Sequence, residues 1–159
     1  MNIILREITP ENFKECIELK VSDNQKTFVA TNLYSIAQSK IYPTHLPFAV
    51  YDGDEMVGFV LYGFDEEEER FYLGRLMIDE KFQGKGYGRA ATLEVIERLK
   101  QVENCKEIYL SFVPENKNAE KLYESIGFKD TGELNGGEII MRYEININAN
   151  PKSAIQNLK

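Results

Sequence analysis

The sequence GKGYGR combines alternating glycines with two cations, between an apolar run and a helical pattern. The glycines are Gly84, Gly86 and Gly88, and the cations are Lys85 and Arg89. Glycines allow successive backbone N–H groups to converge on an anion, and a helix that begins there adds its partly positive N-terminus. The segment therefore predicts a site for a phosphate or pyrophosphate. A plain strand-to-helix turn, made tight by its glycines, is the structural alternative.

Two well-known nucleotide-binding loops do not fit this segment. A Walker A loop requires a Ser or Thr directly after Gly-Lys, and here Gly86 follows Lys85. A Rossmann fingerprint requires the spacing G-x-G-x-x-G close to a first strand, whereas this G-x-G-x-G follows the fourth expected strand. What remains is the general anion cradle of backbone N–H groups.

A second stretch, NKNAEKLYESIGF, places a tyrosine on a short helix. Asn116 or Asn118 can cap the start of this helix, and Gly127 fits the left-handed position at its end. The phenol of Tyr123, with an ordinary pKa of about 10, stays protonated at neutral pH and can act as a general acid. The structural alternative is a tyrosine packed under a sheet with its hydroxyl at the surface.

Strands and helices that alternate along the chain predict an α/β or α+β mixed sheet, in the order β-α-α-β-β-β-α-β-α-β-β. A helix capped by Thr9-Pro10 and a central strand covered on both faces are part of this expectation. The glycine turn leads into a helix that begins at Gly86 or Tyr87. The expected strands are residues 3–8, the two arms of a hairpin around 52–54, the run 71–78 after the turn 65–70, residues 107–113 and a last hairpin around 135–137. The first expected helix follows Pro10, and the second spans 28–37. The third carries Ala90, Leu93, Ile96, Leu99 and Val102 on its apolar face, and the fourth spans 116–126.

The two motifs together resemble the GNAT family of N-acetyltransferases. Gln83 to Gly88 resembles that family's Q/R-x-x-G-x-G/A signature, and residues 116–128 resemble its N-x-x-A-x-x-L-Y-x-x-x-G-F segment. The resemblance covers residues 2–145 and is strongest to bacterial diamine and spermine/spermidine N-acetyltransferases. It implies the GNAT acyltransferase fold, with a central sheet splayed between its fourth and fifth strands.

The resemblance also implies acetyl-CoA as co-substrate and Tyr123 as general acid. A splay would leave strand backbone groups unpaired, and a ligand could satisfy them. For the acceptor amine we expect Asp23, Gln25 and Glu138, and the general base stays open among Glu55, Asp23 and Glu138. Residues expected to bind the co-substrate are Leu76, Met77, Ile78, Gln83, Gly84, Lys85, Gly86, Tyr87, Gly88, Arg89, Asn116, Asn118 and Ala119.

The expected reaction is acetyl transfer to a primary amine of a small polyamine such as spermidine, spermine or a diamine. Polyamine acetyltransferases of this family typically carry an acid where this chain has Gly74, so the acceptor contacts differ here. The acidic run 65–69 is either an attraction for a polycation or a solvated hairpin tip. Alternatives are another acceptor (an aminoglycoside, an amino acid or a protein amine) or a non-catalytic acyl-CoA sensor. A sensor would not need Tyr123.

Bulk properties favour one soluble enzyme domain of residues 1–145, followed by a polar tail of residues 146–159. A net charge of −7 argues against nucleic acid and anionic membranes as partners. The start of the chain resembles a strand and not a signal peptide, so we expect a cytoplasmic protein with Cys16 and Cys105 reduced and buried. One histidine, His45, leaves no cluster for a metal. A homodimer is compatible with the sequence.

Overall fold

Seven strands form one mixed sheet in the order β1-β2-β3-β4-β5-β7-β6. The computed structural model describes residues 1–146, so all but the first residue of the expected tail lies outside the described residues. The succession of helices and strands confirms the expected order, with one short 3₁₀ helix in addition. The strands are β1 (Ile3–Glu7), β2 (His45–Asp52), β3 (Glu55–Asp65), β4 (Arg70–Ile78), β5 (Glu107–Phe112), β6 (Lys129–Asn135) and β7 (Glu138–Glu144).

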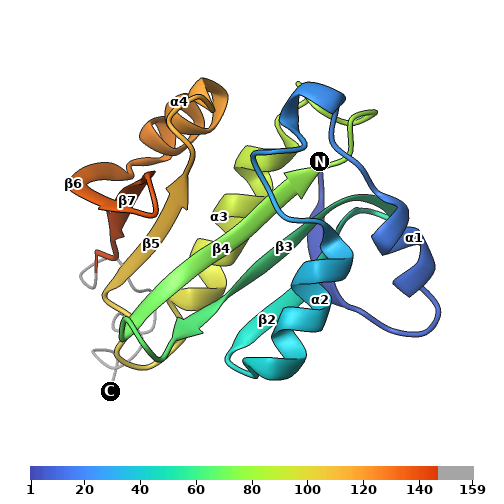
Figure 1. Cartoon of the computed structure of the whole chain (residues 1–159). Coiled ribbons are helices and arrows are strands. Elements are labelled where there is room, and N and C mark those ends of the chain that lie inside the picture. Colours follow the sequence, from blue (N-terminus) through green and yellow to red (C-terminus); the bar gives the residue numbers. More distant parts are fainter. Residues whose placement is uncertain (147–159) are drawn as a thin grey trace, which may run out of the picture.

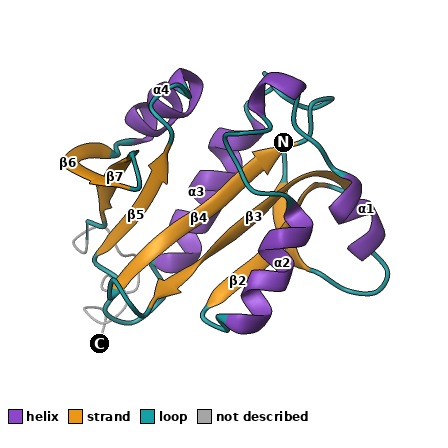
Figure 2. Cartoon of the chain, viewed as in Figure 1, coloured by secondary structure: helices purple, strands orange, loops and turns teal. Residues whose placement is uncertain are grey.

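Helices cover both faces of the sheet (Figures 1 and 2). Helices α3 and α4 pack on one face, over a core that contains Val60, Ile108 and Leu110. Helices α1 and α2 lie on the opposite face, over a smaller core around Phe59 and Met77. The helices are α1 (Phe13–Glu18), the 3₁₀ helix η1 (Asp23–Gln25), α2 (Asn32–Ile41), α3 (Tyr87–Leu99) and α4 (Lys117–Ile126).

Strands β4 and β5 are parallel neighbours that pair only near their starts. Their register joins Phe71 to Ile108 and Tyr72 to Tyr109, and goes no further. From Leu73 onward the two strands separate, as the diverging arrows in Figure 1 show. The splay expected between the fourth and fifth strands is therefore confirmed, and it leaves the facing backbone edges of both strands without a strand partner.

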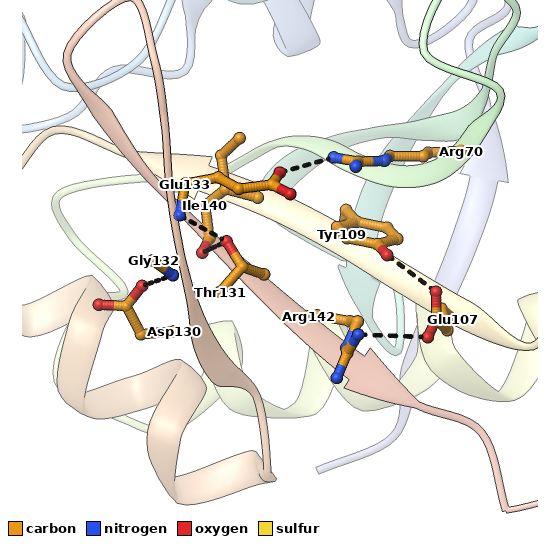
Figure 3. Close-up of polar contacts among 9 residues, drawn as sticks. All are labelled: Arg70, Glu107, Tyr109, Asp130, Thr131, Gly132, Glu133, Ile140 and Arg142. Carbon is orange, nitrogen blue, oxygen red and sulfur yellow. Dashed lines mark hydrogen bonds and ion pairs between the residues drawn. The ribbon is translucent and has the colours of Figure 1, made fainter.

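Polar contacts hold the closed end of this splay. Arg70 at the start of β4 donates to Glu133 of β6 at 3.1 Å, and its guanidinium lies 4.5 Å from the ring centroid of Tyr109 on β5. Figure 3 shows the Arg70 side chain directed at Glu133, and the Tyr109 hydroxyl hydrogen-bonded to Glu107. One side chain of β4 thus contacts both β5 and β6, next to the only two paired positions.

The bounds of the first two helices differ from those expected from the sequence. The first helix begins at Phe13, not at Pro10, because Asn12 and Thr9 form a closed turn in which Asn12 Oδ1 accepts the Thr9 N–H at 2.8 Å. The second helix spans Asn32–Ile41 rather than 28–37, because Thr31 caps it by accepting the Tyr34 N–H at 3.2 Å. The segment before Thr31 is consequently free to line the site.

The sequence also predicted the buried faces of α3 and β4 only in part. In α3 the buried positions include Ala91, Val95 and Leu99, whereas Leu93 is 39% exposed and Val102 lies beyond the helix end. Both faces of β4 are covered as expected, since Leu73 belongs to the core under α3 and Met77 to the core under α1 and α2, but only these two residues of the strand are buried. A strand that borders a splay has no neighbour to cover one edge, and its other side chains face a cavity.

We expect Ile108→Ala to lower the free energy of unfolding by about 2–5 kcal/mol, because Ile108 is fully buried at one of the two positions where β4 and β5 pair. Urea denaturation followed by circular dichroism measures this change. Leu134→Ala is the control, since Leu134 is 69% exposed on β6 and its truncation should change stability by less than about 0.5 kcal/mol. Equal costs for the two variants would contradict the core described above.

Candidate active site

The splay opens into a cavity of about 540 Å³. One wall comes from β4 and the turn that follows it, the other from β5 and α4, and the segment between α1 and α2 adds a third. The cavity is therefore assembled from segments far apart in the chain. Its lining residues are Val21, Gln25, Phe28, Val29, Leu73, Gly74, Arg75, Leu76, Met77, Ile78, Phe82, Gln83, Gly84, Gly86, Tyr87, Gly88, Arg89, Ser111, Phe112, Asn116, Asn118, Ala119, Leu122 and Tyr123.

A β-bulge in β4 determines which side chains face the cavity. Leu61 of β3 pairs with Arg75 and the next residue, Tyr62, pairs with Leu73, so Gly74 is an extra residue in β4. A bulge changes the direction of the side chains that follow it. Arg75 points to the α2 side, where its guanidinium carbon lies 5.9 Å from the ring centroid of Tyr34. Gly74 itself adds no side chain to the cavity.

The turn between β4 and α3 has the geometry of an anion cradle. Gly84 and Gly86 adopt left-handed φ angles of 75° and 88°, which residues with a Cβ rarely adopt. Among residues 1–146, no backbone N–H from Gly84 to Arg89 donates to a backbone carbonyl. A Cβ built on Gly84 would meet nothing within 4 Å. Unpaired donors at the start of a 13-residue helix therefore face open space.

Other side chains of this turn have structural partners. Gln83 donates to Gln25 Oε1 at 2.8 Å and to the Ile78 carbonyl at 2.9 Å, which ties the α1–α2 segment to the end of β4. The Tyr87 hydroxyl donates to Asp52 at 2.9 Å. Lys85 does not line the cavity, since it is exposed and its ammonium donates to the Lys81 carbonyl at 3.3 Å. Its expected part in co-substrate binding stays a prediction.

Asp79 fixes the segment between α1 and α2 to the end of β4. Its carboxylate is buried and accepts the backbone N–H groups of Lys20 and Lys81, both at 3.0 Å. A second bond, from the Glu80 N–H to the Lys20 carbonyl, holds the same junction at 2.9 Å. The wall formed by Val21 to Val29 is thus attached directly to the strand that precedes the glycine turn.

Tyr123 is 9% exposed and faces the cavity from α4. Its ring packs between Phe112 and Phe128, with ring centroids 6.2 and 5.7 Å away. Burial among these rings raises the pKa of Tyr123 to about 12. The phenol therefore keeps its proton throughout the neutral range, as proton donation requires.

The start of α4 is capped by Asn116, whose side chain accepts the Ala119 N–H at 3.2 Å. Of the two caps that the sequence left open, the structure selects Asn116. Asn116, Asn118 and Ala119 all line the cavity beside Tyr123. At the other end, Gly127 is left-handed and Phe128 is buried, which confirms the predicted helix end.

Of the residues expected to contact the acceptor or to act as the base, only some lie at the cavity. Gln25 lines the cavity, but Asp23 does not; its exposed carboxylate pairs with Lys26 at 2.6 Å. Glu55 stands at the exposed start of β3 and is also outside the lining. Glu138 is outside it too, yet it accepts a hydrogen bond from Ser111, which does line the cavity, at 2.5 Å.

A second cavity of about 170 Å³ adjoins the first. The two share Gly74 and Arg75 as lining residues. At the second cavity the Gln38 Oε1 atom is buried without a hydrogen-bond partner among residues 1–146. Asp65, at the end of β3, adds a carboxylate. The remaining lining residues are His45, Leu61, Tyr62, Gly63 and Tyr72.

Comparison with known proteins assigns this architecture. The model of the acetyltransferase (GNAT) family matches residues 11–128. This chain belongs to the GNAT family. It is an N-acetyltransferase that uses acetyl-CoA as its acetyl donor.

Relatives of this chain differ in the activities that their names state. The chain is 34% identical over 152 residues to the spermine/spermidine N(1)-acetyltransferase of Bacillus subtilis, which covers 91% of this chain and 100% of that protein. It is 35% identical over 104 residues to human N-acetylaspartate synthetase, covering 64% of this chain but only 34% of that protein. The spermidine N-acetyltransferase of Vibrio cholerae, solved with CoA and spermine, has a TM-score of 0.68 at 21% identity, over 90% of this chain and 94% of that one.

The residues present fit a CoA thioester. The unpaired N–H groups of the glycine turn suit a pyrophosphate, and the guanidinium of Arg89 lies beside them in the lining. The unpaired edge of β4 from Leu76 to Ile78 suits an amide-containing arm that forms strand-like hydrogen bonds. Gly88 lies close to Leu122 and Ile78, so that α3 packs tightly against α4 at this point.

Some lining residues carry no signal in the sequence. Arg75 and Ser111 enter the site because a bulge and a splay orient them, and neither feature has a distinctive local pattern. Phe112, Leu122 and Phe82 are apolar residues of ordinary core type. Alternation along β5 could have identified Ser111, since it is the one polar residue between the apolar Leu110 and Phe112.

Other sequence expectations concern metals, cysteines and membranes. No helix among the described residues is long and apolar enough to span a bilayer. Within residues 1–146 no group of three or more His, Cys, Asp or Glu side chains is arranged to hold a metal ion. Cys16 and Cys105 are free and buried, and burial raises the pKa of their thiols to about 12 and about 11. Both are therefore protonated, unreactive packing residues.

We expect acetyl-CoA to raise the melting temperature of the wild-type protein, and Gly86→Asp to abolish that shift. The substitution places a negative charge on the turn where a phosphate must approach. Gly132→Asp is the matched control, because Gly132 is also left-handed, at φ 79°, with open space around it, but lies on β6 away from the cavity. A full shift in a folded Gly86→Asp protein would contradict the anion cradle.

Proposed function

We propose that this enzyme acetylates a primary amine of a small polyamine such as spermidine, spermine or a diamine. The observation that carries the proposal is the 34% identity with a spermine/spermidine N(1)-acetyltransferase along that protein's whole length. The second cavity supports it, because it gives a long acceptor a place for its far end.

The acceptor reaches the cavity from the α2 side of the sheet. Its reacting nitrogen lies near Arg75 and Gly74, which line both cavities. A distal ammonium group in the second cavity can donate to Gln38 Oε1, the buried acceptor without a partner, and to Asp65. The exposed carboxylates of residues 66–69 follow Asp65 directly and attract a polycation toward this end.

Arg75 contributes to the proposed reaction in a chain that has Gly74 in place of the usual acid. Its guanidinium is partly buried and forms no ion pair among residues 1–146. Burial lowers the pKa of Arg75, but the group remains a cation. A cation beside an amine disfavours the ammonium form, so Arg75 favours the neutral nucleophile at the reacting end. The second cavity holds the other end.

Tyr123 is the general acid of the proposed reaction. When the amine nitrogen attacks the thioester carbonyl, the carbon–sulfur bond breaks and the sulfur needs a proton. The Tyr123 phenol faces the cavity, keeps its proton because its pKa is about 12, and has no hydrogen-bond partner among residues 1–146 that would compete for it. Phe112 and Phe128 prevent the ring from turning away.

We expect Tyr123→Phe to lower kcat by about 10²–10⁴, because it removes only the proton donor. The ring and its packing stay, so the thermal shift caused by acetyl-CoA should persist. Since burial raises the phenol pKa to about 12, wild-type kcat should not fall between about pH 8 and pH 10 through loss of this proton. Measured turnover within a few-fold of wild type would show that water or another group protonates the sulfur.

One observation favours a second acceptor class, an amine that also carries a carboxylate. Arg75 is a partly buried guanidinium without an ion-pair partner among residues 1–146, and guanidinium groups bind carboxylates well. The similarity to N-acetylaspartate synthetase over 64% of this chain points the same way. An amino acid is therefore the alternative acceptor.

A panel of acceptors separates these two classes. We expect kcat/KM to rank spermidine above aspartate, other amino acids and an aminoglycoside, with CoA thiol release as the measurement. Salt should raise the KM for spermidine, because surface charges are screened over about 8–10 Å at ordinary ionic strength. Aspartate above spermidine would overturn the polyamine assignment.

Asp65→Asn is a matched variant for the same panel. The amide keeps an oxygen for the turn N–H groups of Glu67 and Glu68, which Asp65 Oδ1 accepts at 2.9 and 3.0 Å, and loses only the charge. The KM for spermidine should rise several-fold, while the KM for a short monoamine should stay unchanged.

A further inference from the structure

Ser111 and Glu138 form a polar pair on the acceptor face of the sheet. On β5, Ile108, Leu110 and Phe112 belong to the core under α3, so the alternating residue Ser111 faces the opposite side. The Ser111 hydroxyl donates to Glu138 Oε2 at 2.5 Å. Ser111 lines the main cavity and Glu138 stands directly behind it, outside the lining.

Three other carboxylates lack a hydrogen bond to a cavity-lining hydroxyl. Asp23 is exposed, and the hydrogen bond from Lys26 holds the pKa of its carboxyl below the ordinary value. Glu55 is exposed, outside the lining of both cavities. Asp79 is buried, but both of its oxygens accept backbone N–H groups. Of these four, only Glu138 bonds to a cavity-lining hydroxyl.

Groups from the neighbouring strands face Glu138. From β4, Arg75 is the cation near enough to interact electrostatically with Glu138. From β5 the contact is the neutral Ser111, and from β6 the residue paired with Glu138 is the neutral Asn135. The next acid on β6, Glu133, is engaged by Arg70 at 3.1 Å. Arg75 thus supplies the cation that faces Glu138, while its partners on β5 and β6 are neutral.

We propose that Ser111 and Glu138 form the proton relay that serves as general base of the acetyl transfer. The inference rests on the proposed function only in that an amine attacks within this cavity. Ser111 is the catalytic residue that touches the amine, and Glu138 acts through it. The pair takes the role that no side chain at Gly74 can fill.

The atoms of this step balance. The amine nitrogen forms a bond to the carbonyl carbon and gives a proton to Ser111 Oγ, while the Ser111 hydroxyl proton passes to Glu138 Oε2. The carbon–sulfur bond then breaks, and the sulfur takes the Tyr123 proton. Glu138 releases its proton to water and the Tyr123 phenolate regains one, so the net products are the N-acetyl amine and the CoA thiol.

The test compares Glu138→Gln, Ser111→Ala and wild type with whichever acceptor the panel ranks first. Glu138→Gln keeps an oxygen for the Ser111 hydrogen bond and removes the basic group. We expect both variants to lower kcat by about 10² or more, with KM changed less than about threefold. In Glu138→Gln the acidic limb of the kcat profile against pH should disappear. The thermal shift caused by acetyl-CoA should remain and shows that each variant is folded.

Two further variants separate a chemical role from a structural one. Glu138→Ala should regain part of its kcat when formate is added, because a small carboxylate can occupy the space left behind, whereas Tyr123→Phe should not respond. Glu144→Gln is the matched control: it lies on the same strand with the same alternation, pairs with Arg142 at 2.9 Å, and should have wild-type kcat.

The outcomes for the relay and for the acceptor are independent. Wild-type kcat within about threefold in either Glu138→Gln or Ser111→Ala would overturn the relay, whatever the acceptor. A wild-type panel in which spermidine ranks low would overturn the polyamine proposal and leave the relay to be judged on the better acceptor. A raised KM with unchanged kcat would show that the pair only positions the amine.

Discussion

The separation of β4 from β5 is the constraint on which the rest of this molecule depends. Two parallel strands at the centre of a sheet would normally pair along their length, and buried backbone groups rarely remain without a partner. Here pairing stops after Tyr72 and Tyr109, so the edge of β4 beyond them needs a partner that is not a strand. In the proposed binding mode, the amide-containing arm of the thioester donor is that partner. The closed end is held by the Arg70 contacts to Glu133 and Tyr109, and the sheet therefore opens only toward the glycine turn.

This opening brings together groups that the sequence keeps apart. The glycine turn extends β4 and begins α3, so its free N–H groups lie at one end of the cavity. Tyr123 comes from α4 after β5, on the other side of the opening. In the proposed reaction, the thioester carbonyl lies between these two walls. The packing of Gly88 against Leu122 sets the distance between the two walls. A Cβ built on Gly88 would lie 3.5 Å from the Leu122 side chain.

Sequence reasoning identified the parts whose chemistry is tied to local structure. Glycines with left-handed φ, a capping asparagine and a left-handed helix end at Gly127 each have a local pattern, and the structure places them as expected. Arg75 could not be found in this way, because a bulge determines its direction, and Ser111 is marked only as the polar residue between Leu110 and Phe112. Lys85 stays a predicted co-substrate contact that lies outside the cavity lining. Its charge made it a candidate, but its position in the turn points it to solvent. Glu138 was one of three equivalent carboxylates until the structure showed its hydrogen bond with Ser111, which it reaches diagonally because Ser111 pairs with Ile140 in the register of β5 and β7.

For the proposed polyamine acceptor, the distribution of charge explains how a chain with Gly74 can still act on a cation. An acid at that position would lie beside the reacting nitrogen and would both attract the ammonium form and accept its proton. Gly74 and Arg75 instead leave the reacting end positive, while the acids are at a distance: Asp65 and residues 66–69 beyond the second cavity, and Glu138 behind Ser111. A polyamine has charges several bonds apart, so one end can be held by carboxylates while the other loses its proton. Binding and deprotonation are then separate tasks in separate parts of the cavity, and neither requires the residue that is missing from β4.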